Sequence, residues 1–127
     1  MPVEKKSTIL CIDDEPIILT LLNRILTFEG YQVFTAMNPA EAMKIVDANE
    51  LDLVISDYLM PEITGTELIK LINRKSPNSK KIILTGQAND QEIEKAMQQG
   101  LILKCLSKPI TASMIKKELN GLGRFFN

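Results

Sequence analysis

Short apolar segments alternate with helical patterns along the chain, and this alternation restricts the fold more than any other feature. The predicted strands are residues 8–12, 32–35, 51–56, 81–84 and 103–106. Most of them are largely apolar, as expected of strands in a parallel sheet that helices cover on both faces. A helical pattern follows each one, so the sequence predicts a series of βα units.

Apolar stripes and capping residues delimit the predicted helices. The first stripe is Ile18, Leu21, Leu22, Ile25 and Leu26, and Gly30 is the expected stop. The second helix is expected to begin at Asn38-Pro39-Ala40-Glu41. The third is expected to cover 67–73, with Leu68, Leu71 and Ile72 facing inward. The fourth is expected to run from Asn89-Asp90 to Gly100, and the fifth is expected to cover 111–119.

Five such units predict one α/β domain over residues 1–127, with tails at 1–7 and 121–127. The expected architecture is a doubly wound, five-stranded parallel sheet with helices on both faces. Right-handed crossovers leave few topologies, and the strand order 2-1-3-4-5 is a common one.

The composition excludes several classes of site. The chain has no His, which removes any His base, His metal ligand or His phosphocarrier from its own mechanism. A net charge of −1 and 5% aromatic residues argue against a nucleic-acid-binding module. Cys11 and Cys105 lie in predicted strands that are not neighbours, so no disulfide is expected. With no long apolar run and no secretory leader, we expect a cytoplasmic protein without membrane association.

Polar residues stand where four of the predicted strands end. Asp13 and Asp14 follow the first strand, and Asp57 follows the third. Thr85 ends the fourth strand, and Lys108 comes just after the fifth. In the order 2-1-3-4-5 these four strands are contiguous, so their carboxyl ends are expected to meet at one cleft.

This set of side chains favours phosphoryl chemistry. Three carboxylates at one cleft repel one another, and a hard divalent cation such as Mg²⁺ relieves the repulsion. Lys108 adds a positive charge and Thr85 adds a hydroxyl donor. Such groups position a phosphoryl group and neutralise its charge, and a carboxylate held in line with phosphorus can act as the nucleophile.

These residues occur within motifs that resemble a known family over essentially the whole chain. The motifs are Ile12-Asp13-Asp14-Glu15-Pro16, Asp57-Tyr58-Leu59-Met60-Pro61 followed by Gly65, Leu84-Thr85-Gly86, and Lys108-Pro109. Each is weak alone, but in this order and after these strands they resemble the receiver domain of two-component response regulators. The resemblance implies a flavodoxin-like fold.

The resemblance also implies roles for the site residues. Asp57 would be the phosphoacceptor. Asp14 and Asp57 would bind Mg²⁺ directly, together with the backbone carbonyl of Leu59. Asp13 would act on the metal through a water molecule and pair with Lys108.

Further implications concern the phosphoryl group and the partners. Thr85 and Lys108 would bind phosphoryl oxygens, and Gly86 would leave space beside them. The donor would be the phosphohistidine of a histidine kinase or a His phosphotransfer protein. The domain would be regulatory rather than an enzyme, catalysing only its own phosphorylation and slow autodephosphorylation. An output domain would follow the second tail in a longer protein, and a phosphorylation-dependent homodimer would use the face of the fourth helix, fifth strand and fifth helix.

Three positions depart from or tune the family pattern. Receivers often carry an aromatic residue three positions before the Lys, where this chain has Cys105, so we expect a muted rearrangement of that face. Leu59 and Gln87 stand two residues past the Asp and the Thr, where family members control water attack. The side chain of Leu59 cannot hydrogen-bond a water molecule and that of Gln87 can, which predicts slow to moderate hydrolysis.

Other functions compete with this interpretation. A phosphatase of the haloacid-dehalogenase type would need a second Asp at position 59, where this chain has Leu. A flavodoxin would need a Ser/Thr-rich phosphate loop after the first strand, where acidic residues would repel the phosphate. A phosphorylation-independent scaffold of receiver shape is the third alternative.

Overall fold

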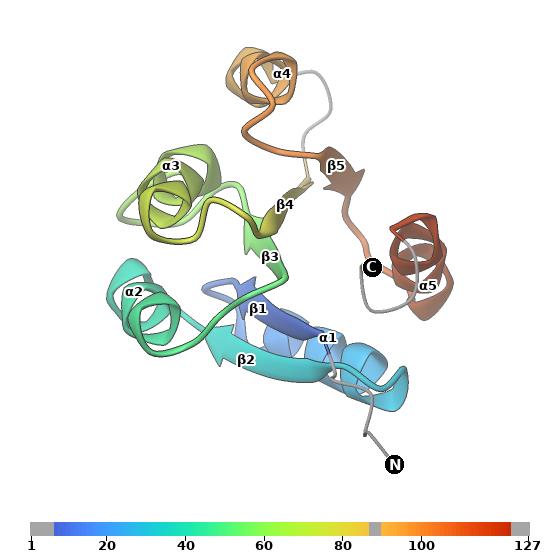
Figure 1. The fold of residues 1–127 in the computed structure, drawn as a ribbon. Coiled ribbons are helices and arrows are strands. Elements are labelled where there is room, and N and C mark those ends of the chain that lie inside the picture. The colour runs from blue at the N-terminus through green and yellow to red at the C-terminus, as the bar shows by residue number, and fades with distance from the viewer. Residues whose placement is uncertain (1–6, 87–89, 123–127) are drawn as a thin grey trace.

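The structure, a computed structural model, describes residues 7–86 and 90–122, and in them it has one parallel sheet between two layers of helices (Figure 1). The sheet order is β2-β1-β3-β4-β5, which confirms the predicted α/β topology. The strands are β1 (Thr8–Ile12), β2 (Gln32–Ala36), β3 (Leu53–Asp57), β4 (Lys80–Thr85) and β5 (Lys104–Ser107). All four strand pairs are parallel.

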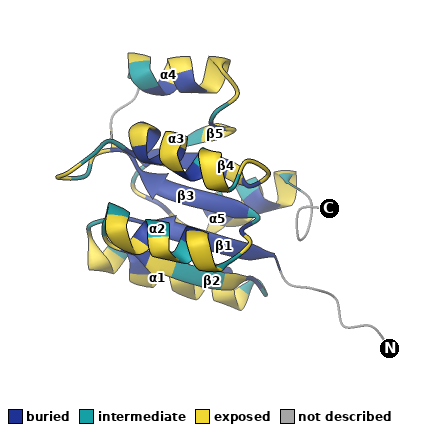
Figure 2. Ribbon diagram, turned by 60° about the vertical axis from the view of Figure 1, so that its left-hand side comes forward, coloured by how far each residue is buried: buried dark blue, intermediate teal, exposed yellow. Residues whose placement is uncertain are grey.

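The helices cover both faces of this sheet. They are α1 (Pro16–Phe28), α2 (Pro39–Ala48), α3 (Gly65–Lys75), α4 (Gln91–Gln98) and α5 (Ala112–Gly121). One hydrophobic cluster lies beneath α1 and α5, and two others lie beneath α2, α3 and α4 on the opposite face. The central strands are accordingly buried on both sides (Figure 2). No helix in the described part of the chain is long and apolar enough to cross a membrane.

Local signals in the sequence locate several helix ends, although α3 begins two residues before and ends two residues after its predicted bounds of 67–73. Asn38 accepts a hydrogen bond from the N–H of Glu41 and caps α2, while Asp90 caps α4 through two backbone N–H groups. The hydroxyl oxygen of Thr111 caps α5 by accepting a hydrogen bond from the N–H of Met114. Gly30 and Gly100 follow their helices with positive φ values of 96° and 75°, a conformation that glycine adopts without steric cost.

The predicted inward faces of two helices are partly wrong. In α1, Leu21 is 38% exposed and Leu19 takes its place beside Leu22 and Leu26 in the core. In α3, Leu71 is equally exposed and Ile69 is buried. Both alternatives satisfy helical spacing, and the way each helix sits on the sheet decides between them.

The chain ends also differ slightly from the expected boundaries. Ser7, assigned to the first tail, is buried, and its carbonyl accepts a hydrogen bond from the N–H of Gln32. Helix α5 continues to Gly121, two residues beyond the predicted end. Cys11 and Cys105 are both free, as expected from their separate strands.

Candidate functional site

The site lies at the carboxyl edge of the sheet, because parallel strands all end on that side. Asp13 directly follows β1, and Asp57 is the last residue of β3. Thr85 ends β4, and Lys108 directly follows β5. Since β3 pairs with both β1 and β4, the structure brings these four residues to adjacent strand ends, as the sequence predicts.

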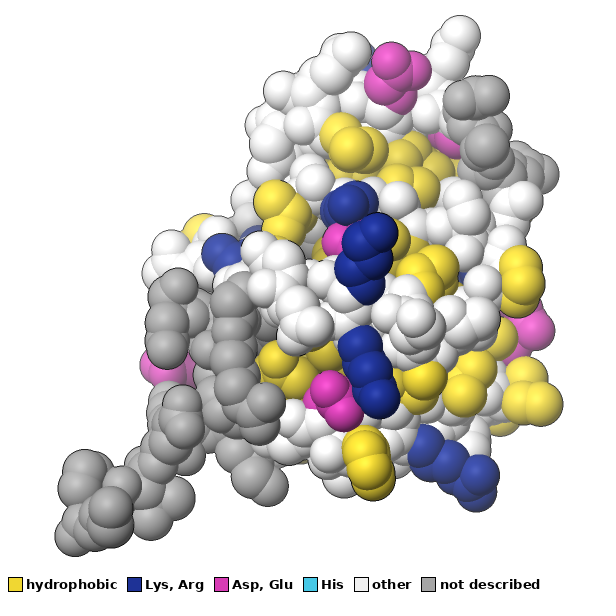
Figure 3. Space-filling model, turned by 90° about the vertical axis from the view of Figure 1, so that its right-hand side faces the viewer, with side chains coloured by type: hydrophobic (Ala, Val, Ile, Leu, Met, Phe, Trp, Pro, Cys, Tyr) yellow, Lys and Arg dark blue, Asp and Glu magenta, His cyan; other side chains and the backbone are white. Residues whose placement is uncertain are grey.

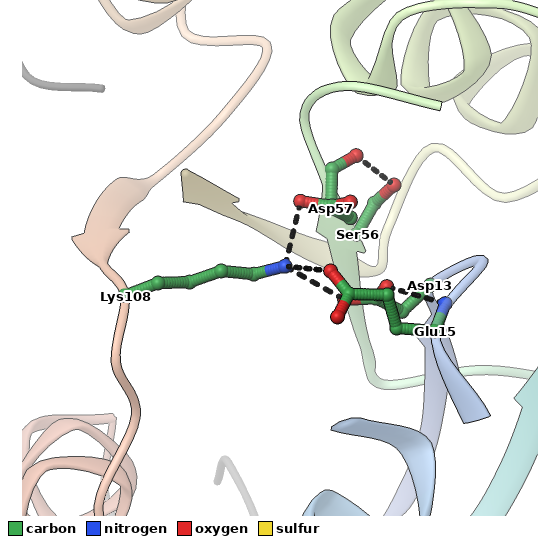
Figure 4. A network of polar contacts seen from close by, with 5 residues as sticks. All are labelled: Asp13, Glu15, Ser56, Asp57 and Lys108. Atoms are coloured by element: carbon green, nitrogen blue, oxygen red, sulfur yellow. Dashed lines mark hydrogen bonds and ion pairs between the residues drawn. The ribbon is translucent and has the colours of Figure 1, made fainter. Parts of the chain in front are cut away.

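Lys108 connects the acidic residues of this edge. Its ammonium lies 3.1 Å from Asp13 Oδ2 and 3.1 Å from Asp57 Oδ1. Glu15 Oε1 is 3.8 Å away. Figure 4 shows Lys108 reaching across from the β5 side so that its Nζ lies between the carboxylates of the two neighbouring strands. The backbone N–H of Lys108 also donates to the carbonyl of Thr85, which fixes the start of this side chain.

Three carboxylates gather around one point. Asp13, Asp14 and Asp57 each offer an oxygen, and these oxygens all lie within 4.8 Å of one another. Asp13 is fully buried and Asp57 nearly so, while Asp14 is partly exposed. Lys108 contributes a single positive charge, so the cluster with this lysine retains excess negative charge when all three carboxyls are ionised.

Burial sets the protonation behaviour of this cluster. It raises the pKa of Asp13, although the N–H of Glu15 and the ammonium of Lys108 act in the opposite direction. Burial likewise raises the pKa of Asp57. The hydrogen bond from Lys108 lowers this pKa, and the negative charge of Asp13 raises it further. Burial also lowers the pKa of Lys108, but its contacts with Asp13 and Asp57 outweigh this, and the net direction is upward. The raised pKa of Lys108 favours its charged form, whereas burial favours the protonated forms of the Asp13 and Asp57 carboxyls.

The donor set fits a hard divalent cation. Carboxylate oxygens are the ligands that Mg²⁺ prefers, and partial exposure at Asp14 is compatible with retained water ligands. A cation at this point would also offset the excess negative charge of Asp13, Asp14 and Asp57. The structure thus contains an acidic cluster suited to Mg²⁺.

The backbone around Asp57 is held by contacts that the sequence analysis did not identify. The buried Ser56 hydroxyl donates to the carbonyl of Asp57 at 3.0 Å. Gly65 N–H donates to the Tyr58 carbonyl at 2.6 Å, and a Cβ at Gly65 would overlap the Asp57 carbonyl oxygen. A hydroxyl at the end of an otherwise apolar strand was the available signal for Ser56. Because of the overlap with the Asp57 carbonyl, residue 65 must be glycine for α3 to begin this close to the end of β3.

The remaining predicted residues surround the cluster. Thr85 is buried at the end of β4, and a Cβ at Gly86 would have no neighbour within 4 Å, which is compatible with open space there. The side chain of Leu59 is 55% exposed, and its backbone forms an isolated bridge with Thr64. Cys105 is half-buried against the cluster beneath α4. Gln87 lies outside the described residues.

Sequence comparison identifies relatives among signalling proteins. The family model of the response regulator receiver domain matches residues 9–120. The transcriptional regulatory protein GlrR of Escherichia coli (strain K12) is 39% identical over 106 residues, which are 84% of this chain and 24% of that protein. The sensor histidine kinase RcsC of the same strain is 35% identical over 111 residues, 87% of this chain and 12% of that protein. The chain thus spans a quarter or less of these two relatives.

Solved structures of similar size agree with this result. A receiver domain protein (CheY-like) from Methanospirillum hungatei JF-1 matches with a TM-score of 0.84 and 27% identity, covering 92% of this chain and 93% of the other. The response regulator protein TrrA from Thermotoga maritima, in complex with Mg(2+)-BeF, matches with a TM-score of 0.77 and 33% identity, covering 91% and 98%. With the family model, these matches establish that the chain belongs to the response regulator receiver domain family.

Proposed function

We propose that Asp57 accepts a phosphoryl group from a phosphohistidine on a histidine kinase or a His phosphotransfer protein. The observation that carries this proposal is the ammonium of Lys108 placed 3.1 Å from both Asp13 and Asp57 at the edge where the strands end. A carboxylate with a fixed cation beside it and further acidic groups around it is equipped for phosphoryl transfer.

The residues of the chain divide the work of this transfer. An oxygen of Asp57 bonds to phosphorus while the bond between phosphorus and the donor imidazole nitrogen breaks. Lys108 and the Thr85 hydroxyl bind the phosphoryl oxygens on the product side. Asp14, Asp57 and the Leu59 carbonyl would hold Mg²⁺, with Asp13 acting through water. When bound, this ion neutralises negative charge on the transferring group.

The persistence and effect of the phosphoryl group depend on neighbouring side chains. We propose slow to moderate autodephosphorylation, because the side chain of Leu59 has no group that can hydrogen-bond a water molecule, whereas glutamine, the residue type at position 87, has one. Cys105 replaces the aromatic residue that many relatives carry at this place in β5. We therefore propose that the conventional movement of an aromatic ring toward the Thr is absent here, and that the rearrangement of this face is muted.

The modified domain would alter its binding to an output domain or partner. One candidate surface is the α4–β5–α5 face, where exposed Lys104 of β5 pairs with Glu118 of α5 and a phosphorylation-dependent homodimer would form. On the side of the molecule that carries α5, basic side chains stand between hydrophobic ones (Figure 3). We place this exchange in the cytoplasm, without direct nucleic-acid or membrane binding by this domain.

Intact mass after incubation with acetyl phosphate and Mg²⁺ tests the proposal. Wild type is expected to gain one labile phosphoryl group, and Asp57→Asn is expected to gain none. Asp47→Asn makes the same change at an exposed carboxylate of α2 and should behave as wild type. Absence of gain in wild type would favour the phosphorylation-independent scaffold, and an equal gain in Asp57→Asn would place the acceptor elsewhere.

A further inference from the structure

A second polar network begins at the residue after Asp57 and ends at helix α4. The hydroxyl of the buried Tyr58 lies 3.0 Å from Asp90 Oδ1 and 3.0 Å from Glu92 Oε2. The other oxygen of Glu92 accepts hydrogen bonds from the hydroxyls of Thr64 and Thr66. Tyr58 thus connects the end of β3 to the first residues of both α3 and α4.

The single proton of the Tyr58 hydroxyl is shared between two acceptors, Asp90 and Glu92. A phenolic hydroxyl has one proton, so it can donate fully to only one carboxylate at a time. Each carboxylate also has donors of its own, because Asp90 accepts from the N–H groups of Glu92 and Ile93. Glu92 keeps its threonine donors, and the hydrogen bond from Thr66 is the main reason that the pKa of this carboxyl is lowered. Either arrangement of the Tyr58 proton therefore leaves both carboxylates hydrogen-bonded.

The main chain of Tyr58, the residue after β3, is hydrogen-bonded to β4 and to the start of α3. Its N–H donates to the Leu84 carbonyl at 2.9 Å, directly before Thr85, and its carbonyl accepts from Gly65. A displacement at Asp57 or Thr85 therefore acts directly on a residue whose N–H and carbonyl are both hydrogen-bonded. At the other end of the network, α4 is short and buries only Ile93 and Ala96, so a modest change at its first turn can move it.

We propose that Tyr58 and Glu92 couple the phosphorylation state of Asp57 to the position of helix α4. The inference rests on the proposed function of Asp57 and adds the route by which its state reaches the surface. A phosphoryl group on Asp57 brings additional negative charge next to the residue whose hydroxyl is shared by two carboxylates. This charge changes how the Tyr58 hydroxyl is shared between Asp90 and Glu92. The Tyr58–Glu92 hydrogen bond is then lost, and the first turn of α4 shifts.

Amide NMR shifts of residues 91–98 test this route, with beryllium fluoride and Mg²⁺ as a stable mimic of the phosphoryl group and Mg²⁺ alone as reference. Wild type is expected to show mimic-dependent shifts in the first turn of α4, the part of the helix that the network contacts. Glu92→Gln keeps the side-chain shape and an acceptor for the threonines but cannot accept from Tyr58 at its amide nitrogen, and it should lose these shifts. Glu94→Gln makes the same change at an exposed position of the same helix and should keep them.

A second variant, Tyr58→Phe, keeps the test valid if Glu92→Gln fails to fold. Tyr58→Phe removes only the hydroxyl and should also lose the α4 response, whereas Tyr31→Phe should retain it. The chain has two Tyr and no Trp, so in a Tyr31→Phe background the emission reports Tyr58 alone. This emission is expected to change on addition of the mimic and to stop changing when Glu92→Gln is added.

Mass measurement with acetyl phosphate separates failure of the route from failure of the function. If Glu92→Gln and Tyr58→Phe gain a phosphoryl group and α4 still responds as in wild type, the coupling route is overturned while Asp57 remains the acceptor. If wild type gains a phosphoryl group without any α4 response, the route is likewise overturned. If wild type gains no phosphoryl group, the proposed function fails and the inference fails with it.

Discussion

Two lysines at opposite edges of the sheet show how differently the same side chain can be used. Lys108 lies at the carboxyl edge between carboxylates of β1 and β3. Lys81, near the start of β4, is 3% exposed, and its ammonium donates to Asn73 Oδ1 at 2.6 Å and to the Ser76 carbonyl at 2.8 Å. Burial lowers the pKa of Lys81, whereas Asp13 and Asp57 outweigh burial at Lys108 and raise its pKa. Lys81 is hydrogen-bonded by neutral acceptors only. Lys108 faces more carboxylates than it can neutralise, so its edge of the sheet retains negative charge that a cation can offset.

The largest effect expected from this comparison is on phosphorylation. Lys108→Met removes the ammonium proposed to bind the phosphoryl oxygens. The initial rate of phosphorylation should fall by roughly 10²–10³-fold, as for the loss of one preorganised charge-stabilising group. Lys81→Met should leave the rate unchanged, because Lys81 lies at the far edge of the sheet. Phosphoryl incorporation from acetyl phosphate, followed by intact mass, measures both. Equal losses in the two variants would contradict the division between the edges.

The next effect concerns the metal. At about one hundred times its dissociation constant, Mg²⁺ should raise the free energy of unfolding by about 2.7 kcal/mol, because the proposed site exists only in the folded chain. Asp14→Asn should lose this stabilisation, and Lys81→Met should keep it. Urea denaturation with Mg²⁺ and with a chelator provides the measurement. A full Mg²⁺ effect in Asp14→Asn would remove this residue from the metal site.

Two glycines extend the comparison to the backbone. Gly65→Ala introduces a Cβ that overlaps the Asp57 carbonyl, so we expect a loss of roughly 1–3 kcal/mol in stability and slower phosphorylation. Gly100→Ala, in the turn after α4, forces an L residue to φ 75° at a cost of roughly 1–2 kcal/mol and should leave phosphorylation unchanged. Denaturation curves and initial phosphorylation rates separate the two outcomes. An unaffected rate in Gly65→Ala would show that the acceptor tolerates movement of α3.

The smallest effect is a pH dependence of stability at Lys81. Because its folded pKa lies below the ordinary 10.5, the unfolded chain holds this proton at pH values where the folded chain releases it. Stability therefore rises with pH from the folded pKa of Lys81 toward 10.5, and the cost of burying the charge is fully present only below the folded pKa. Relative to Lys81→Met, wild type should become more stable over this range in urea denaturation. A constant difference between the two proteins would contradict the shifted pKa.

The convergence of Asp13, Asp57 and Lys108 was predictable because parallel strands place their carboxyl ends on one side. Capping residues such as Asn38 and Asp90 were predictable for a similar reason, since they act within a few residues of their own position. Both are consequences of local geometry that a sequence pattern records directly.

Other features depend on how elements pack and were not predictable. Leu19 and Leu21 both fit a helical stripe, and only the placement of α1 on the sheet decides that Leu19 is buried. Lys81 belonged to a predicted strand, but its burial requires acceptors from α3 and the turn after it. The Tyr58–Glu92 contact joins residues 34 positions apart, and Glu92 by itself is an ordinary residue of a helix first turn.

The two thiols of the chain differ enough to be told apart chemically. Cys11 is completely buried in β1, and burial raises its pKa to about 12, so almost no thiolate forms there. Cys105 is half-buried in β5, where burial and the charge of Asp90 raise its pKa. An alkylating dye at mildly alkaline pH should therefore attach slowly at Cys105 and leave Cys11 unmodified. The natural chain thus provides a single attachment point beside α4 without any engineered residue.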